Sequence, residues 1–186
     1  MVYITALWLP ILISAVIVFV ASSVLHMVFT YHHHDHGKLP EENKLLEAMR
    51  QAGVAPGNYR FPCPDSMRDM SSPEMIERYK KGPVGLMHVV PSGPPAMPKY
   101  LAMWFAYCLL IGFFAAYLTG RTLSAGESYL SVFRVSGTAA FLAYGLGGIQ
   151  DSIWRGQVWS TTLKHTADGL VYALLTAGVF GWLWPR

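Results

Sequence analysis

A run of histidines near residue 30 contains the side chains best suited to chemistry in this chain. Residues 31–36 read YHHHDH, and His26 lies just before them. Imidazole nitrogens bind transition metals, and a carboxylate serves either as a ligand or as the acceptor that fixes an imidazole tautomer. If a helix continues through the run, His32 and His36 lie one turn apart on one face, where two imidazoles can reach a common ion. The run therefore predicts a site for a transition metal or a haem.

A second polar group lies in the last quarter of the sequence. His165 and Asp168 are three residues apart, which places both side chains on one face of a helix. In the sharper of two interpretations, this face meets the first histidine group and completes its ligand set. The predicted ligands are, in full, His26, His32, His33, His34, Asp35, His36, His165 and Asp168, with His88 as a further imidazole.

Both groups also have ordinary structural explanations. Histidine side chains are amphipathic and lie comfortably among lipid headgroups without binding anything. Ionisable residues near the end of a membrane span usually pair with one another, as Asp151 and Arg155 would at helical spacing. Neither group closes a coordination shell by sequence alone.

No motif of a known enzymatic reaction accompanies these residues. The sequence has no glycine-rich phosphate loop, no HExxH and no GxSxG, so no catalytic residue is predicted. Cys63 and Cys108 cannot form a disulfide framework, and no run of like charges is present to bind nucleic acid. These observations weigh against an enzyme and against a nucleic-acid-binding protein.

The elements that must position these groups are long apolar helices. Of the 186 residues, 53% are hydrophobic and 13% are charged, and a bilayer core about 30 Å thick needs roughly 20 helical residues to span. The sequence predicts an all-α integral membrane protein with four transmembrane helices, at residues 4–29, 100–118, 130–149 and 166–184. Residues 4–29 are expected to remain as a span instead of a cleaved signal, because no Lys or Arg precedes them and hydrophobicity continues to Phe29.

The connection between the first two spans is rich in proline. We expect residues 1–30 to be the first transmembrane helix, residues 31–98 an extramembrane lid, and residues 99–186 the remaining helices. Within the lid, Pro40 and Gly53 bound one short helix, and a Ser72 cap opens a second that runs to Lys81. Residues 59–61 and 86–90 are expected to form a short β pair.

Small residues recur at every fourth position in two of the predicted spans. Such a stripe flattens one helix face, so that another backbone can approach it closely. The neighbour can belong to the same chain or to another copy. The stripes consist of Gly112, Ala116 and Gly120, and of Gly169, Ala173, Ala177 and Gly181.

Four spans would place the histidine groups and the lid on one side of the membrane. Most Lys and Arg residues fall on that side, including Lys38, Lys99 and Arg155 near the span ends. Because basic residues favour the cytoplasmic side, we predict a bacterial inner-membrane protein with the histidine-rich face in the cytoplasm and both termini outside.

Two classes of function fit this architecture. The first is an accessory or structural subunit that contacts the lipid bilayer and binds a partner, as a homo-oligomer or within a larger membrane complex. The alternative is a membrane protein that binds a transition metal or haem for electron transfer or metal delivery. A transporter fits less well, because the spans lack ionisable residues at mid-membrane depth.

Overall fold

The computed structural model describes residues 1–186 and divides into two compact units. One unit, called the bundle here, comprises Met1–Asp35 and Ala96–Arg186. The other, the connecting unit, is His36–Pro95. All long helices belong to the bundle, and both short strands belong to the connecting unit.

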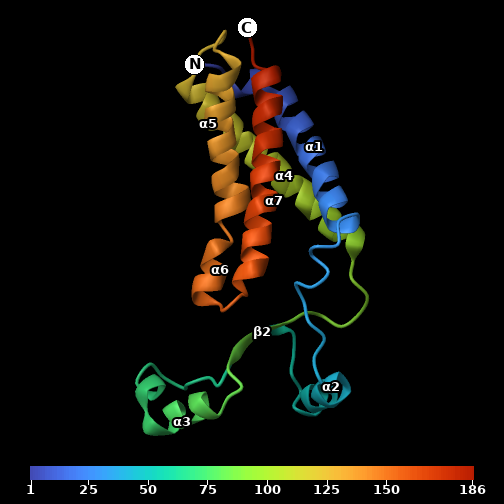
Figure 1. Ribbon diagram of the computed structural model, residues 1–186, viewed down its shortest axis with the longest axis vertical. Coiled ribbons are helices and arrows are strands. Elements are labelled where there is room, and N and C mark those ends of the chain that lie inside the picture. The colour runs from blue at the N-terminus through green and yellow to red at the C-terminus, as the bar shows by residue number, and fades with distance from the viewer. The chain divides into compact units, whose positions relative to one another are not determined.

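The bundle is built from antiparallel helices that lie side by side (Figure 1). A short 3-10 turn at Ile4–Leu7 leads into the first helix, and a π-helical turn at Leu142–Leu146 interrupts the third. The α-helices are α1 (Trp8–Met27), α4 (Met97–Thr122), α5 (Tyr129–Phe141), α6 (Ile149–Trp154) and α7 (Trp159–Trp182).

Three helical segments are long and apolar enough to cross a membrane: Ile4–Met27, Met97–Thr122 and Tyr129–Trp154. The three corresponding predicted segments are therefore helices with the length and hydropathy that a span needs. The predicted fourth span, residues 166–184, corresponds to α7, which is helical but is not among these segments. Lys164, His165 and Asp168 make the first half of α7 too polar, so four spans are not confirmed.

The small-residue stripes face helices of the same chain. A Cβ atom added at Gly120 would lie 2.6 Å from the carbonyl oxygen of Val2, and one added at Gly112 would lie 3.3 Å from that of Ile11. In α7, a Cβ atom added at Gly169 would lie 2.6 Å from the carbonyl carbon of Tyr144. The stripe of α4 therefore admits the amino-terminal segment and α1, and Gly169 admits the π-helical turn.

Met1 and Arg186 lie at the same end of the bundle (Figure 1). The Val2 N–H donates to the Gly120 carbonyl oxygen at 2.8 Å, and the Gly126 N–H donates to the Pro185 carbonyl oxygen at 3.0 Å. Both bonds involve the region where α4 ends and the link to α5 begins, so this link ties the two ends of the chain together.

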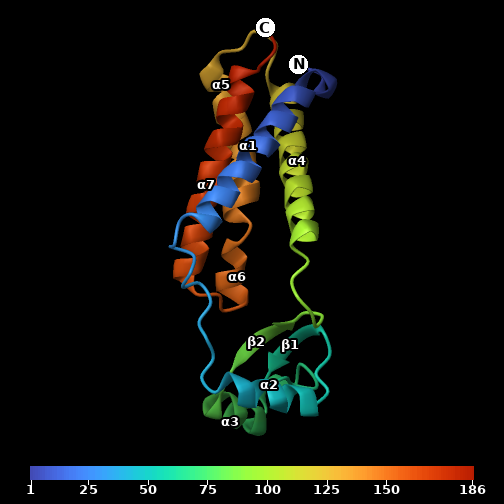
Figure 2. The ribbon, with the colours of Figure 1, turned by 90° about the vertical axis from the view of Figure 1, so that its right-hand side faces the viewer.

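The connecting unit contains the two short helices and the strand pair that the sequence predicts (Figure 2). Ser72 accepts a hydrogen bond from the Met75 N–H at 3.2 Å, as a helix cap should. In the antiparallel pair, Tyr59 lies opposite Met87. The elements are α2 (Glu42–Gln51), β1 (Gly57–Phe61), a 3-10 turn (Asp69–Ser71), α3 (Pro73–Lys81) and β2 (Gly85–Val89).

Candidate metal centre

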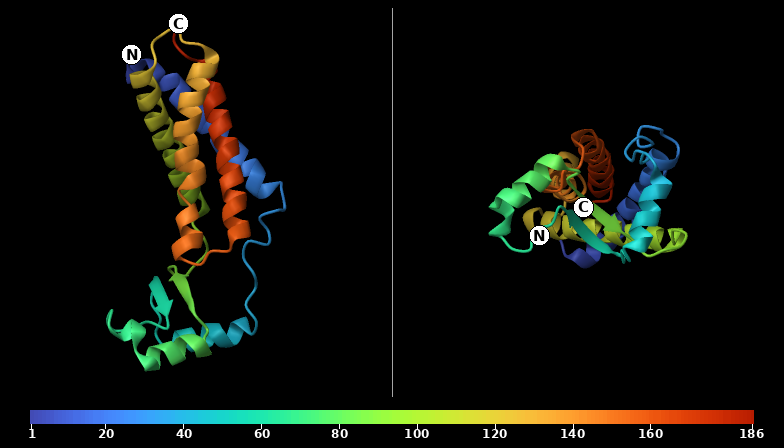
Figure 3. Two further views of the ribbon diagram at one scale, coloured as in Figure 1. Left: turned by 60° about the vertical axis from the view of Figure 1, so that its left-hand side comes forward. Right: turned by 90° about the horizontal axis from the view of Figure 1, so that it is seen from below.

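The end of α1 lies beside the first half of α7 in the ribbon (Figure 3). Four side chains with metal-binding atoms meet in this region. His26 belongs to the last turn of α1, His32 follows that helix, and His165 and Asp168 lie on α7. Each residue offers one ligand atom, and these four atoms all lie within 4.8 Å of one another. The bundle therefore brings together the two polar groups that are more than 100 residues apart in sequence.

The end of α1 decides how the first group is arranged. The helix stops at Met27, and the chain then turns, with the His33 N–H donating to the Thr30 carbonyl oxygen and the Asp35 N–H to that of His32, both at 3.0 Å. The prediction that a continuing helix places His32 and His36 on one face is therefore wrong. The turn instead stacks the ring of His32 on that of His26, with centroids 4.5 Å apart and planes at 8°.

Helical spacing on α7 supplies the other two members. His165 and Asp168 are separated by three residues and so point to the same side of the helix. The His165 ring stacks on His32 with centroids 5.1 Å apart. Asp168 is buried, with a side chain only 6% exposed, whereas His26 and His165 are exposed. The cluster is thus closed on the carboxylate side and open on the side of these two imidazoles.

His26 is held in the tautomer that a metal ion needs. Its Nδ1 lies 3.0 Å from the carbonyl oxygen of Ser22. Because a carbonyl oxygen can only accept, this Nδ1 carries the proton and donates it. In the neutral ring, the lone pair of Nε2 then remains available to a ligand.

His32 lies between two carboxylates. Its Nδ1 donates to Asp35 Oδ2 at 2.6 Å, and its Nε2 lies 2.7 Å from Asp168 Oδ2. Burial lowers the pKa of His32 most, but the hydrogen bonds to Asp35 and Asp168 outweigh that effect and raise it overall. A cation placed between Nε2 and Asp168 would take the place of the proton there, while Asp35 would keep the ring oriented.

Lys164 fixes Asp35 from the other side. Its Nζ donates to Asp35 Oδ1 and to the Tyr31 carbonyl oxygen, both at 2.6 Å. The hydrogen bond from Lys164, together with that from His32, lowers the pKa of Asp35 to about 2. Asp35 is therefore an anion over the physiological pH range, and Lys164 ties the turn after α1 to α7.

Tyr31 supports the second carboxylate. Its hydroxyl donates to Asp168 Oδ1, which leaves Oδ2 facing His32. Burial and then this bond to Asp168 raise the pKa of Tyr31 to about 12, so the hydroxyl remains a donor. Such outer contacts orient metal ligands and are a usual part of metal sites. His26, His32 and Asp168 each have one.

The structure separates the predicted ligands into two sets. It brings together His26, His32, His165 and Asp168. Asp35 lies outside this group and accepts a hydrogen bond from His32. His33 and His34 are exposed and lie outside the cluster. His36 and His88 belong to the connecting unit, where His88 Nδ1 lies 2.7 Å from Asn58 Oδ1.

Sequence reasoning did not assign Tyr31 or Lys164 to the site. Tyr31 is adjacent to the histidine run, and Lys164 precedes His165, so proximity to the motif was the only signal. The ordinary pairing expected elsewhere is present, because Arg155 Nη1 lies 2.9 Å from Asp151 Oδ1.

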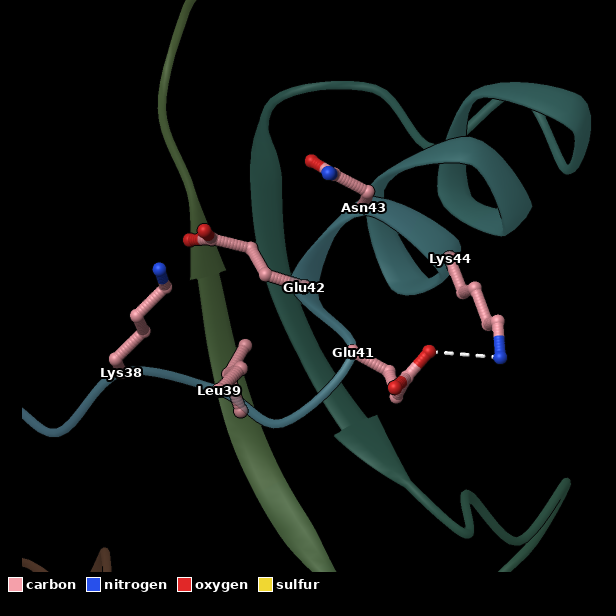
Figure 4. A pocket seen from close by; sticks show the side chains of 6 residues that line it. All are labelled: Lys38, Leu39, Glu41, Glu42, Asn43 and Lys44. Atoms are coloured by element: carbon pink, nitrogen blue, oxygen red, sulfur yellow. Dashed lines mark ion pairs between the residues drawn. The ribbon is translucent and has the colours of Figure 1, made fainter.

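A hollow in the connecting unit gives no comparable site (Figure 4). Its charged side chains are exposed, and Lys44 Nζ pairs with Glu41 Oε2 at 2.7 Å. These two side chains are 82% and 70% exposed, so water screens the pair. The lining residues are Lys38, Leu39, Glu41, Glu42, Asn43 and Lys44.

The chain matches no known protein family, no curated protein and no solved structure. Functional inference therefore rests on the chemistry of the cluster itself.

Proposed function

We propose that this protein is an integral membrane metalloprotein that holds one divalent transition-metal ion between His26, His32, His165 and Asp168. The observation that carries the proposal is the approach of their four ligand atoms to within 4.8 Å of one another. Metal–nitrogen bonds of about 2.0–2.1 Å place the ligand atoms of a tetrahedral ion about 3.3 Å apart. Closing the shell around an ion would therefore take ligand-atom shifts of about 1 Å and a turn of the stacked His26 and His32 rings, because an imidazole nitrogen binds an ion in its ring plane.

The donor set and the local charge favour an ion of intermediate softness. Imidazole and carboxylate suit Zn²⁺, Fe²⁺ and Co²⁺, and the absence of thiolate in the cluster disfavours Cu⁺. The cluster and its hydrogen-bond partners include two carboxylates, Asp35 and Asp168, and one ammonium group, that of Lys164, which pairs with Asp35. Once the Nε2 proton of His32 is displaced, the two carboxylates outnumber the one ammonium group, and a bound cation offsets this negative charge.

The same geometry favours a single ion over a haem. The rings of His26 and His32 stack with centroids 4.5 Å apart, which leaves no room for a porphyrin between them. The exposed imidazoles of His26 and His165 leave one side of the cluster open. A further ligand arriving from that side would bind as a fifth ligand, because the four side chains already fill a tetrahedral shell.

We further propose that α7 completes a four-span bundle in a bacterial inner membrane. This is supported by the 24-residue length of α7 and by its packing against α1 and α5. The position of Met1 and Arg186 at one end of the bundle also supports an even number of passages. Lys99, Arg155 and Lys164, which lie near the ends of the helices on the side of the metal cluster, favour the cytoplasm for that side. Reporter fusions at Met1 and Arg186 should both report the periplasm, and opposite locations would contradict the proposal.

The role of accessory subunit remains the alternative. The small-residue stripes do not by themselves call for a partner, because Gly112, Gly120 and Gly169 already contact the same chain. A partner or second copy would have to bind the exposed apolar helix faces or the connecting unit. Co-purification of a fixed set of subunits with a metal-free protein would favour this alternative.

The decisive experiment measures metal binding by the full chain in detergent. The protein is stripped with a chelator, loaded separately with Zn²⁺ and Co²⁺, and analysed for metal per chain. We expect about one ion per chain and a Co²⁺ absorption spectrum typical of nitrogen and oxygen ligands.

Variants separate the cluster from the other histidines. His26→Ala and Asp168→Asn should each weaken binding by more than the 10- to 100-fold typical of losing an outer contact. The matched control is the double variant His33→Ala, His34→Ala, which removes two exposed imidazoles of the same segment and should bind normally. Binding that is absent in the natural protein, or that depends equally on His33 and His34, would refute the proposal.

A further inference from the structure

An apolar pocket of about 500 Å³ opens directly beside the metal cluster. His26, His165 and Asp168 form one wall of this pocket. The volume is within the range of small-molecule sites, which are mostly apolar with a few converging polar groups. The open side of the cluster therefore leads into a space large enough for an organic molecule.

Three aromatic rings form another wall. Trp104, Tyr144 and Tyr172 all line the pocket, and their ring centroids are 5.6 to 6.3 Å apart in tilted or edge-to-face pairs. Aromatic rings in such an arrangement pack well against a further planar ring. The Trp104 indole N–H is already used, because it donates to Ser22 Oγ at 2.8 Å.

Tyr172 supplies a donor without a partner. The residue is 4% exposed, and its hydroxyl is buried with no hydrogen-bond partner. A buried hydroxyl without a partner is costly, so an acceptor supplied by a ligand would be favourable. The acceptor should belong to the edge of a planar group, because the neighbouring rings of Trp104 and Tyr144 limit the space.

The π-helical turn positions one of these rings. Tyr144 lies within Leu142–Leu146, where Gly145 approaches Gly169 of α7. Short π-helical segments inside α-helices are frequent at functional sites. Here the segment places Tyr144 on the pocket wall, one residue from the tightest contact with α7.

The rim of the pocket is apolar. Met27, Met97 and Leu101 line it and are 78%, 60% and 46% exposed. Met27 ends α1 and Met97 begins α4, so these residues lie at the ends of two predicted spans. A ligand arriving from lipid would cross this rim, whereas a charged, water-soluble ligand would meet little there to bind.

We propose that the pocket binds a lipid-soluble quinone, with one carbonyl oxygen toward the metal ion and the ring against Trp104, Tyr144 and Tyr172. The metal contact rests on the proposed function, whereas the fit to the aromatic wall does not. A quinone combines the planar ring, the carbonyl acceptors and the apolar chain that the three parts of the pocket require. An alkyl chain alone would leave the Tyr172 hydroxyl unpaired.

The test uses the full chain in detergent, with decylubiquinone as the probe and decane as a ligand that has only the alkyl chain. Leu101→Trp places a large ring at the rim, and Leu110→Trp is its matched control on α4, outside the pocket and 52% exposed. We expect saturable binding of one quinone per chain, at least 10-fold weaker in Leu101→Trp and unchanged in Leu110→Trp. Tyr172→Phe should weaken binding several-fold, because it removes one hydrogen bond.

Metal content is measured on the same samples, so that two failures can be told apart. A metal-loaded protein that shows no saturable quinone binding, or that binds decane as well as the quinone, would overturn this inference and leave the proposed function intact. A protein that binds no metal but still binds the quinone saturably, with weaker binding in Leu101→Trp and unchanged binding in Leu110→Trp, would overturn the proposed function and keep the pocket assignment. If both hold, quinone addition should also shift the Co²⁺ spectrum.

Discussion

Replacing Gly169 by alanine should separate α7 from the π-helical turn and disturb the metal cluster. The added methyl group would lie 2.6 Å from both the Gly145 nitrogen and the Tyr144 carbonyl carbon. These are backbone atoms and cannot rotate away, so the two segments must move apart by about 1 Å to reach normal contact. Because Asp168 is the preceding residue, this movement should also weaken metal binding.

The magnitude follows from comparing Gly169→Ala with Gly178→Ala on the same helix. Overpacking typically costs about 1–3 kcal/mol, and replacing a helical glycine by alanine gains up to about 1 kcal/mol from helix propensity. At Gly178 the nearest atom to an added methyl group is the Tyr129 hydroxyl oxygen, at 3.7 Å, which is an ordinary contact. The difference between the two variants therefore isolates the steric cost, because the propensity gain is common to both.

The assay is thermal unfolding in one detergent, followed by circular dichroism. A steric cost of about 1–3 kcal/mol should lower the apparent Tm of Gly169→Ala below that of Gly178→Ala by about 2–12 °C, at about 2–4 °C per kcal/mol. The Co²⁺ affinity of Gly169→Ala should fall as well, while that of Gly178→Ala should not. Equal Tm values for the two variants would show that α7 does not approach the π-helical turn this closely, and the reasoning would fail.

Three further predictions concern the outer contacts, the ion and the connecting unit. Asp35→Asn should weaken metal binding by about 10- to 100-fold, because His32 loses its charged hydrogen-bond acceptor. Competition with a coloured chelator measures the affinity. An unchanged affinity would show that Asp35 does not help to orient His32 as a ligand. Adding Zn²⁺ at about 100 times its Kd should stabilise the protein by about 2.7 kcal/mol, seen as a Tm increase that a chelator reverses and that Asp168→Asn lacks. Ser72→Ala should destabilise α3 by about 1 kcal/mol through loss of its cap, and hydrogen exchange should quicken in α3 but not in α2.

The local elements could be predicted from the sequence because their causes are local. A long apolar run can satisfy its peptide groups in a bilayer only as a helix, and this identified the segments that became α1, α4 and α5. The Ser72 cap and the short runs around Tyr59 and Met87 likewise depend on neighbouring residues only. The sequence also predicted the helix that became α7, although its first half is too polar for α7 to count among the candidate membrane spans.

The metal cluster was only partly predictable. Its residue types and the pairing of His165 with Asp168 follow from composition and helical spacing. Which imidazoles meet depends on where α1 ends, and the sequence offered no stop signal at Met27. The expected helical pair of His32 and His36 was therefore wrong, and the stacked pair of His26 and His32 took its place.

The sequence by itself determined the helices, the short strand pair and the kinds of chemical group available. Only the tertiary structure decided that Asp168 faces His32 and that Tyr31 and Lys164 hold the carboxylates. The physical reason is that periodicity specifies which face of a helix a residue occupies. It does not specify the longitudinal register of α1 against α7 or the path of the turn between Met27 and Asp35, and these two features bring the ligands together.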